Sequence, residues 1–298
     1  MSSLLFSFRS GVLAAQQLHA PQQTIDALAI GFVCIWILYV IFYWSALISR
    51  YVMKLKTMGI RFAMGFLALC LLFILLQAGK IARSTKGVDY LARPFERIKD
   101  QGSLKILFLG DSTAVGVGSP SPQTSTAGWF SRDFPDASIE NISQNGLKLC
   151  GLREKLKFIQ GDHYDLIVVQ IGANDIMRLT PLSKIDGDVR FILESLRKKS
   201  RQIVLLHSGD VGTAPIFIWP FSWILSQRSY ALREIYQKAV KDNGALYVDL
   251  IRFNADQVFI SDPKKYYAPD SLHLSASGYY VWYQAIRITL TQAGVKFK

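Results

Sequence analysis

Two long uncharged stretches stand near the start of the chain. Residues 27–47 form an apolar run of 21 residues, and residues 62–79 form a second run of 18. A helix needs about 20 apolar residues to cross the hydrocarbon core of a bilayer. The pattern therefore predicts a membrane anchor of two transmembrane helices in residues 1–79, followed by a polar, basic juxtamembrane linker in residues 80–102.

Beyond residue 102 the chain alternates between short apolar runs and longer amphipathic stretches. The short runs suit buried parallel strands, and the stretch 185–199 places its apolar residues on one helical face. Strands joined by helical crossovers predict an α/β fold, a three-layer sandwich with a central parallel five-stranded sheet, in residues 103–298. The five predicted strands are residues 104–110, 137–142, 165–171, 202–206 and 245–250.

The first predicted strand ends in a candidate nucleophile. It closes on Gly110 and Asp111, and Ser112 follows at its carboxyl end, where open α/β sheets bind their ligands. A serine hydroxyl is a poor nucleophile at neutral pH, so it needs a histidine to take its proton and a carboxylate to orient that histidine. Asp270 and His273 stand three residues apart near the end of the chain. The pattern indicates a serine hydrolase.

Two further strand ends carry groups suited to an oxyanion. Gly146 follows the second predicted strand, and Asn174 follows the third. A backbone N–H at Gly146 and the side-chain amide of Asn174 are both donors that can stabilise negative charge developing on a substrate oxygen.

With these four segments assembled, the chain resembles the SGNH/GDSL hydrolase family. The four blocks of that family match Ser112, Gly146, Asn174, and His273 with Asp270. The resemblance implies a flavodoxin-like SGNH-hydrolase fold and a role for each residue. Ser112 would be the nucleophile and would form the oxyanion hole together with Gly146 and Asn174. His273 would be the general base, and Asp270 would orient it.

The resemblance leaves the substrate class open, because Thr113 stands where the family usually has Leu. We expect a membrane-anchored serine esterase that hydrolyses lipid-like acyl esters through an acyl-enzyme. One alternative is an O-acetyl esterase or acyltransferase acting on an envelope polysaccharide. An alternative of another class is a membrane-tethered binding module that keeps the fold without turnover.

The least explained segment is the apolar stretch 214–225 between the fourth and fifth predicted strands. One interpretation is packed core. The other is an acyl-binding lid or a surface that dips into the bilayer.

The remaining histidines do not indicate a metal site. His207 follows the fourth predicted strand and fits a buried strand-end histidine, whereas His163 fits a solvated turn. No histidine or cysteine cluster has the spacing of metal ligands, so we expect no metal and no cofactor.

The net charge of +12 is concentrated near the predicted anchor. Residues 1–100 hold eleven Lys or Arg and four Asp or Glu, so they carry +7 and leave +5 for the rest. Anionic lipid headgroups explain this distribution better than nucleic acid does, and no nucleic-acid-binding motif accompanies the charge. We expect the lipid bilayer and an ester substrate as partners, and no nucleic acid; the sequence leaves the oligomeric state open.

The basic residues near the two apolar runs also bear on orientation. The connection between the runs holds four basic residues and no acidic one, whereas five basic residues flank the outer ends. A short loop of unopposed positive charge is hard to translocate, so we expect it in the cytoplasm and the catalytic domain outside. The expected location is a bacterial inner membrane, as a multi-pass protein. The four residues of the connection are Arg50, Lys54, Lys56 and Arg61.

Overall fold

The chain forms two compact units, Met1–Ala82 and Arg83–Lys298, and each is described by itself. The computed structural model describes residues 22–51, 57–84, 88–99, 104–252 and 255–295.

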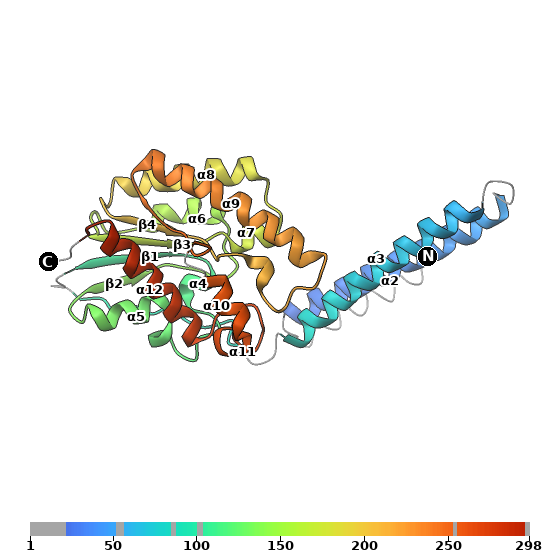
Figure 1. Ribbon diagram of the computed structural model, residues 1–298, viewed down its shortest axis with the longest axis horizontal. Coiled ribbons are helices and arrows are strands. Elements are labelled where there is room, and N and C mark those ends of the chain that lie inside the picture. The colour runs from blue at the N-terminus through green and yellow to red at the C-terminus, as the bar shows by residue number, and fades with distance from the viewer. Residues whose placement is uncertain (1–21, 52–56, 85–87, 100–103, 253–254, 296–298) are drawn as a thin grey trace. The chain divides into compact units, whose positions relative to one another are not determined.

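The first unit contains two long helices, α2 (Gln22–Tyr51) and α3 (Thr57–Ser84) (Figure 1). By length and composition, the part of α3 from Ala63 to Ser84 can cross a membrane. The corresponding apolar part of α2, among the residues described, runs from Gly31 to Ala46 and is shorter than a full span. Both predicted spans are therefore helical, and one of them meets the length required of a transmembrane helix.

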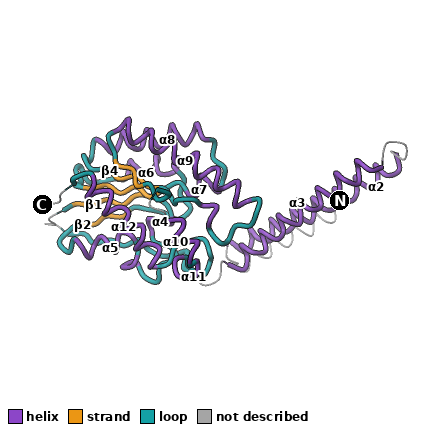
Figure 2. Tube along the Cα trace, viewed as in Figure 1, coloured by secondary structure: helices purple, strands orange, loops and turns teal. Residues whose placement is uncertain are grey.

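The second unit is built on a five-stranded parallel sheet, as predicted (Figure 2). Its strands lie in the order β2-β1-β3-β4-β5. The central strands are almost wholly buried, which explains why they appear in the sequence as continuous apolar runs. The strands are β1 (Lys105–Gly110), β2 (Ser138–Asn141), β3 (Leu166–Gln170), β4 (Ile203–Leu206) and β5 (Leu246–Val248).

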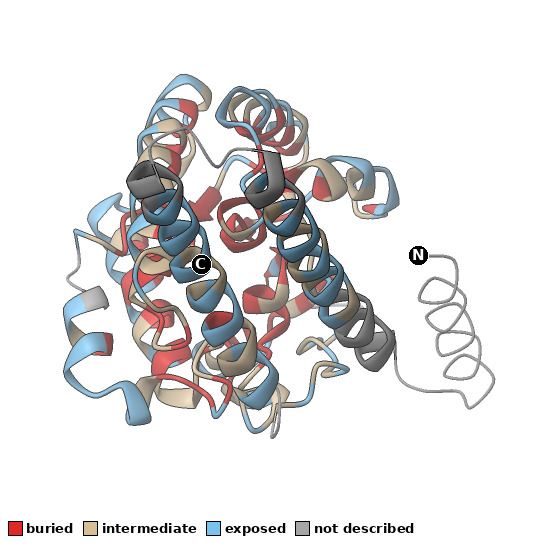
Figure 3. Cartoon of the chain, turned by 90° about the vertical axis from the view of Figure 1, so that its right-hand side faces the viewer, coloured by how far each residue is buried: buried red, intermediate tan, exposed pale blue. Residues whose placement is uncertain are grey.

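Helices cover both faces of this sheet and complete three layers. Alternate residues of β1 point to opposite faces, so Ile106 and Phe108 belong to one core, and Leu107 and Leu109 to the other. Figure 3 shows that buried positions follow the strands and the inward faces of the helices. One face is covered by α5 (Thr126–Asp133) and α12 (Ala276–Gln292), and the other by α6 (Leu149–Lys155), α8 (Leu182–Arg197) and α9 (Phe221–Asn243).

Short helical turns occupy several connections of the sheet. They matter for function because some of them follow the carboxyl ends of the strands. They are α4 (Ser112–Val115), η1 (Pro122–Thr124), η2 (Leu156–Phe158), α7 (Ala173–Met177), η3 (Val211–Thr213), α10 (Ala255–Ser261) and α11 (Pro263–Tyr266).

Local sequence features account for two of these helices. The expected apolar face of α8, including Val189 and Leu193, is buried against the sheet. The helix α12 begins after Ser275, whose hydroxyl accepts a hydrogen bond from the N–H of Gly278 and so caps the first turn.

The apolar segment 214–225 divides into two parts. Ala214 and Ile216 are buried in the core beside α12. The later part leads into α9. Trp219, two residues before this helix, and Trp223, within it, keep 67% and 60% of their surface exposed. The packed-core interpretation therefore describes the beginning of the segment, while the two tryptophans remain available as a surface.

Candidate active site

The backbone around Ser112 is fixed by a close approach of two strands. At the end of β1, a Cβ on Gly110 would lie 1.8 Å from the carbonyl oxygen of Gln170 on β3, so only glycine fits. The next residue, Asp111, caps α4, because its carboxylate accepts hydrogen bonds from the N–H of Thr113 at 2.9 Å and from its hydroxyl at 2.8 Å. Ser112 thus stands as the first residue of α4, at the carboxyl end of a central strand.

Asp270, His273 and Ser112 form a chain of hydrogen bonds. The Nδ1 atom of His273 lies 2.6 Å from Oδ2 of Asp270, and its Nε2 atom lies 2.9 Å from Oγ of Ser112. Asp270 is 1% exposed. A carboxylate at Nδ1 keeps the proton on that nitrogen, so Nε2 is left free to accept the proton of the serine.

The loop before α12 holds this arrangement by local bonds. The second carboxylate oxygen of Asp270 accepts hydrogen bonds from the N–H of Leu272 at 3.0 Å and of His273 at 2.9 Å. The loop is closed by the N–H of Ala268, which donates to the carbonyl of His273 at 2.8 Å. Asp270 therefore orients both the backbone and the ring of His273.

The electrostatics of this pair favour a charged carboxylate. Burial alone would raise the pKa of the Asp270 carboxyl, but the hydrogen bond and charge of His273 and the N–H groups of Leu272 and His273 outweigh it. The pKa of Asp270 therefore lies below its usual value. An ionised carboxylate at Nδ1 can stabilise an imidazolium, so the pair is suited to accept a proton at Nε2 of His273.

The two predicted oxyanion donors lie at the carboxyl ends of the strands beside β1. Asn174 is in α7, directly after β3, and is 6% exposed. Its Nδ2 atom is buried and has no hydrogen-bond partner among the described residues. Gly146 follows β2 with a φ of +72°, a conformation that favours glycine. An unsatisfied buried N–H group is costly unless a ligand accepts from it, which fits a substrate oxyanion.

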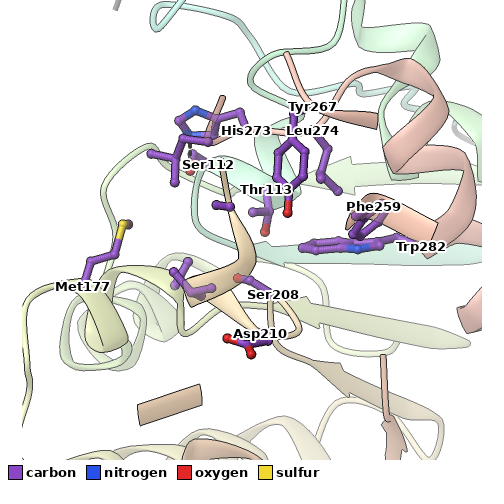
Figure 4. A pocket seen from close by; sticks show the side chains of 14 residues that line it. Ser112, Thr113, Met177, Ser208, Asp210, Phe259, Tyr267, His273, Leu274 and Trp282 are labelled. Carbon is purple, nitrogen blue, oxygen red and sulfur yellow. Dashed lines mark hydrogen bonds between the residues drawn. The ribbon is translucent and has the colours of Figure 1, made fainter. Parts of the chain in front are cut away.

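A small cavity of about 50 Å³ adjoins Ser112 and His273 (Figure 4). Phe259, Tyr267 and Trp282 line one side of it. The wall is mostly apolar, so the cavity is suited to a hydrocarbon group attached to a reacting carbonyl.

Comparison with known proteins places the chain in a family. Residues 108–281 match the model of the GDSL-like Lipase/Acylhydrolase family, which is more than half of the chain. The chain belongs to this family. The family is named for lipases and acylhydrolases, enzymes that act on ester bonds.

Individual relatives agree with the assignment. A GDSL-like esterase of Mycobacterium tuberculosis is 25% identical over 181 residues, which cover 58% of this chain and 57% of that protein. Among solved structures, LAE5, an alpha/beta hydrolase enzyme from the metagenome of Lake Arreo, has a TM-score of 0.52 at 15% identity and covers 65% of this chain and 96% of its own. TesA has a TM-score of 0.51 at 15% identity, and the match covers 63% of this chain and 98% of TesA. At these identities the solved structures establish the fold alone.

One residue at the site of this GDSL-like hydrolase has no signal in the sequence. Tyr90, in the predicted juxtamembrane linker, places its hydroxyl 3.1 Å from Oδ2 of Asp270. A single tyrosine in a basic stretch carries no recognisable motif, and only the three-dimensional structure brings it to Asp270.

His207 is a core residue, as the sequence suggests. It is buried at the end of β4, where its Nδ1 atom accepts a hydrogen bond from the N–H of Gly209 at 3.1 Å. Its ring lies against the rings of Tyr236 and Tyr247. Burial lowers the pKa of the His207 imidazole to about 4. A proton on Nδ1 would face the N–H of Gly209, so the folded domain holds His207 neutral.

This buried imidazole predicts an acid-sensitive fold. The unfolded chain takes up a proton at this side chain near pH 6.5, so the free energy of unfolding decreases as pH falls from about 6.5 towards 4. At pH 5 the expected loss is about 2 kcal/mol relative to pH 7. His207→Gln should remove this part of the loss, because its amide oxygen can accept from Gly209 without charging. Urea denaturation of the wild type and of His207→Gln at pH 7 and pH 5 measures the free energy of unfolding of each protein.

The matched control is His163→Gln, which changes a solvent-exposed histidine in a loop. It should leave the acid sensitivity of the wild type intact. An equal stability loss in His207→Gln and in the wild type would contradict the prediction.

Proposed function

We propose that this protein is a membrane-anchored serine esterase that hydrolyses acyl esters through an acyl-enzyme. The observation that carries the proposal is the chain of hydrogen bonds from Asp270 through His273 to Oγ of Ser112, at 2.6 Å and 2.9 Å. It combines the nucleophile, the base and the orienting carboxylate that ester hydrolysis by serine requires.

The reaction follows from these positions in two steps. Oγ of Ser112 attacks the ester carbonyl while Nε2 of His273 takes its proton, and the alcohol leaves with that proton. Water then attacks the acyl-enzyme with His273 again acting as base, and the acid is released. Asp270 remains ionised throughout and stabilises the imidazolium.

The oxyanion of each tetrahedral intermediate needs donors that are already in place. We assign this role to the N–H groups of Ser112 and Gly146 and to Nδ2 of Asn174. The unsatisfied, buried amide of Asn174 supports the assignment, since it would gain its partner only when the substrate oxygen becomes negative.

The cavity favours a short acyl group. The sequence led us to expect lipid-like esters, but a volume of about 50 Å³ is well below the roughly 150 Å³ of a cavity that binds benzene. An acetyl or butyryl chain fits such a space, whereas a palmitoyl chain would have to leave it. The O-acetyl esterase alternative therefore gains support from the structure.

The expected result on a series of nitrophenyl esters is a fall in kcat/KM with chain length. Acetate and butyrate should be the best substrates, and octanoate should be at least about tenfold poorer, because overfilling a packed site costs about 1–3 kcal/mol. Met177→Ala shortens a half-buried side chain that lines the cavity. It should reduce the difference in kcat/KM between the acetate and octanoate esters. The detergent-solubilised full chain is used throughout. Activity that instead rises from acetate to palmitate would favour lipid-like esters and contradict the short-acyl proposal.

The anchor part of the proposal rests on α3. The apolar helix from Ala63 to Ser84 supports a membrane span, and the basic residues around it suit anionic headgroups. We further propose that the catalytic domain lies outside the cytoplasm of a bacterial inner membrane.

Alkaline carbonate washing should therefore leave the full chain in the membrane fraction, because a spanning helix is removed only by detergent. Release by carbonate alone would contradict a spanning anchor. Protease added to spheroplasts should digest the catalytic domain; protection from the protease would place it in the cytoplasm.

A further inference from the structure

The segment of residues 88–99 precedes both the first strand and the part of the chain matched by the family model, which begins at residue 108. It nevertheless reaches the active site. The hydroxyl of Tyr90 lies 3.1 Å from Oδ2 of Asp270, and the ring of Tyr90 meets the ring of His273 edge-on with centroids 5.8 Å apart.

We propose that Tyr90 is a positioning residue that acts on the reaction through Asp270, and that residues 88–99 are an integral part of the active site. This inference rests on the proposed Ser112 mechanism. It adds a residue outside the family's four motif blocks, on the segment that follows the apolar helix α3.

In the hydrogen bond between Tyr90 and Asp270, the ionisation state of the carboxyl group decides which residue is the donor. An ionised carboxylate only accepts, so the phenol of Tyr90 is the donor. Burial and the nearby charge of Asp270 raise the pKa of Tyr90 to about 12, so the phenol keeps its proton at neutral pH. Oδ2 of Asp270 therefore accepts from Tyr90 and from Nδ1 of His273, and each donor restricts where the carboxylate can turn.

Tyr90 also contacts the other side of the site. Its carbonyl oxygen accepts a hydrogen bond from the side-chain amide of Asn145. Asn145 directly precedes Gly146, whose N–H we assign to the oxyanion hole. One residue is thus bonded both to the carboxylate that orients the base and to the loop that carries an oxyanion donor.

The rest of the segment is bound firmly enough to hold Tyr90 in place. Arg97 pairs with Ile139 on β2 through two backbone hydrogen bonds of 2.9 Å and 2.7 Å. Its guanidinium donates to the carbonyl oxygens of Ala137, Ser131 and Phe134. By contrast, Leu91 beside Tyr90 is 90% exposed, so apolar packing at that residue does not position the tyrosine.

The test compares Tyr90→Phe with the wild type in the full chain in detergent. Tyr90→Phe keeps the ring and removes only the donor. We expect kcat for nitrophenyl acetate to fall about tenfold, as for loss of one hydrogen bond to a charged group, with KM within about twofold. Tyr280→Phe is the matched control, because it removes a tyrosine hydroxyl from α12 at a residue that does not line the active-site cavity.

The pH profile separates positioning from mere stability. Without the Tyr90 donor, the Asp270 carboxylate attracts the imidazolium proton more strongly, so the acid limb of kcat/KM should move to higher pH. Among the described residues, the titratable groups that interact electrostatically with the Asp270–His273 pair are Tyr90, Asp111 and Tyr279. The melting temperature should stay close to that of the wild type.

A second variant covers the case in which Tyr90→Phe folds poorly. Incorporation of 3-fluorotyrosine at position 90 keeps the shape and makes the phenol a stronger donor, so the acid limb should move to lower pH. Opposite shifts in the two variants support the proposal.

Two results would overturn it. One is wild-type kcat and pH profile in Tyr90→Phe. The other is a lower kcat with an unchanged pH profile, where the loss of kcat equals the loss of folded protein. The folded fraction is counted by fluorophosphonate labelling. Either result leaves the Ser112 mechanism intact, whereas hydrolysis that survives in Ser112→Ala would refute the mechanism itself.

Discussion

Ser112→Ala is expected to lower kcat/KM for nitrophenyl acetate by about 10⁴-fold or more. The variant keeps the fold, because Ser112 is the first residue of a short helix whose cap is the carboxylate of Asp111. It removes the atom that His273 contacts at 2.9 Å, so no acyl-enzyme can form. Serine hydrolases lose about this much when one member of the triad is removed, and what remains comes from binding and the oxyanion hole.

The control for this prediction is Ser195→Ala on α8, whose hydroxyl bonds only to the carbonyl of Phe191 among the described contacts. Its kcat/KM for nitrophenyl acetate should equal that of the wild type. Fluorophosphonate labelling adds a test that needs no substrate: the wild type and Ser195→Ala should label and Ser112→Ala should not. Folded wild-type protein that does not label would favour the membrane-tethered binding module.

Asn174→Ala is expected to lower kcat by about 10²–10³-fold with little change in KM. The buried Nδ2 atom has no partner in the described part of the free protein, so its hydrogen bond is gained as the substrate oxygen becomes negative. An interaction made mainly in the transition state affects kcat, and removal of one oxyanion donor has effects of this size. Steady-state kinetics on nitrophenyl acetate with active-site titration measures it.

Asn243→Ala, at the end of α9, serves as the matched amide deletion. It should leave both constants near those of the wild type. If Asn174→Ala instead raised KM and left kcat unchanged, the amide would bind the ground state, and its assignment to the oxyanion hole would be wrong.

The positions of the proposed catalytic residues explain how a small domain can hold them rigidly. Ser112, Gly146 and Asn174 follow three adjacent parallel strands, so the sheet sets their spacing through its hydrogen bonds. His273 comes from the loop before α12, which packs on the same sheet through a core that includes Trp282. The chemistry therefore rests on elements that are buried and bonded, and the loops contribute only the final few residues.

The sequence by itself determined the sheet and singled out the candidate site residues. Buried parallel strands need continuous apolar runs, and all five runs became strands. The four family blocks are short local patterns, so Ser112, Gly146, Asn174 and His273 could be named without a fold.

The tertiary structure decided what depends on residues distant in the chain. The hydrogen bond between Ser112 and His273 joins positions 161 residues apart, and Tyr90 meets Asp270 across 180 residues. The small volume of the cavity depends on side chains such as Phe259 and Tyr267, which converge only in the fold. Local apolar patterns reveal which residues are buried, but they do not specify which distant side chains meet, because that is set by how the layers pack.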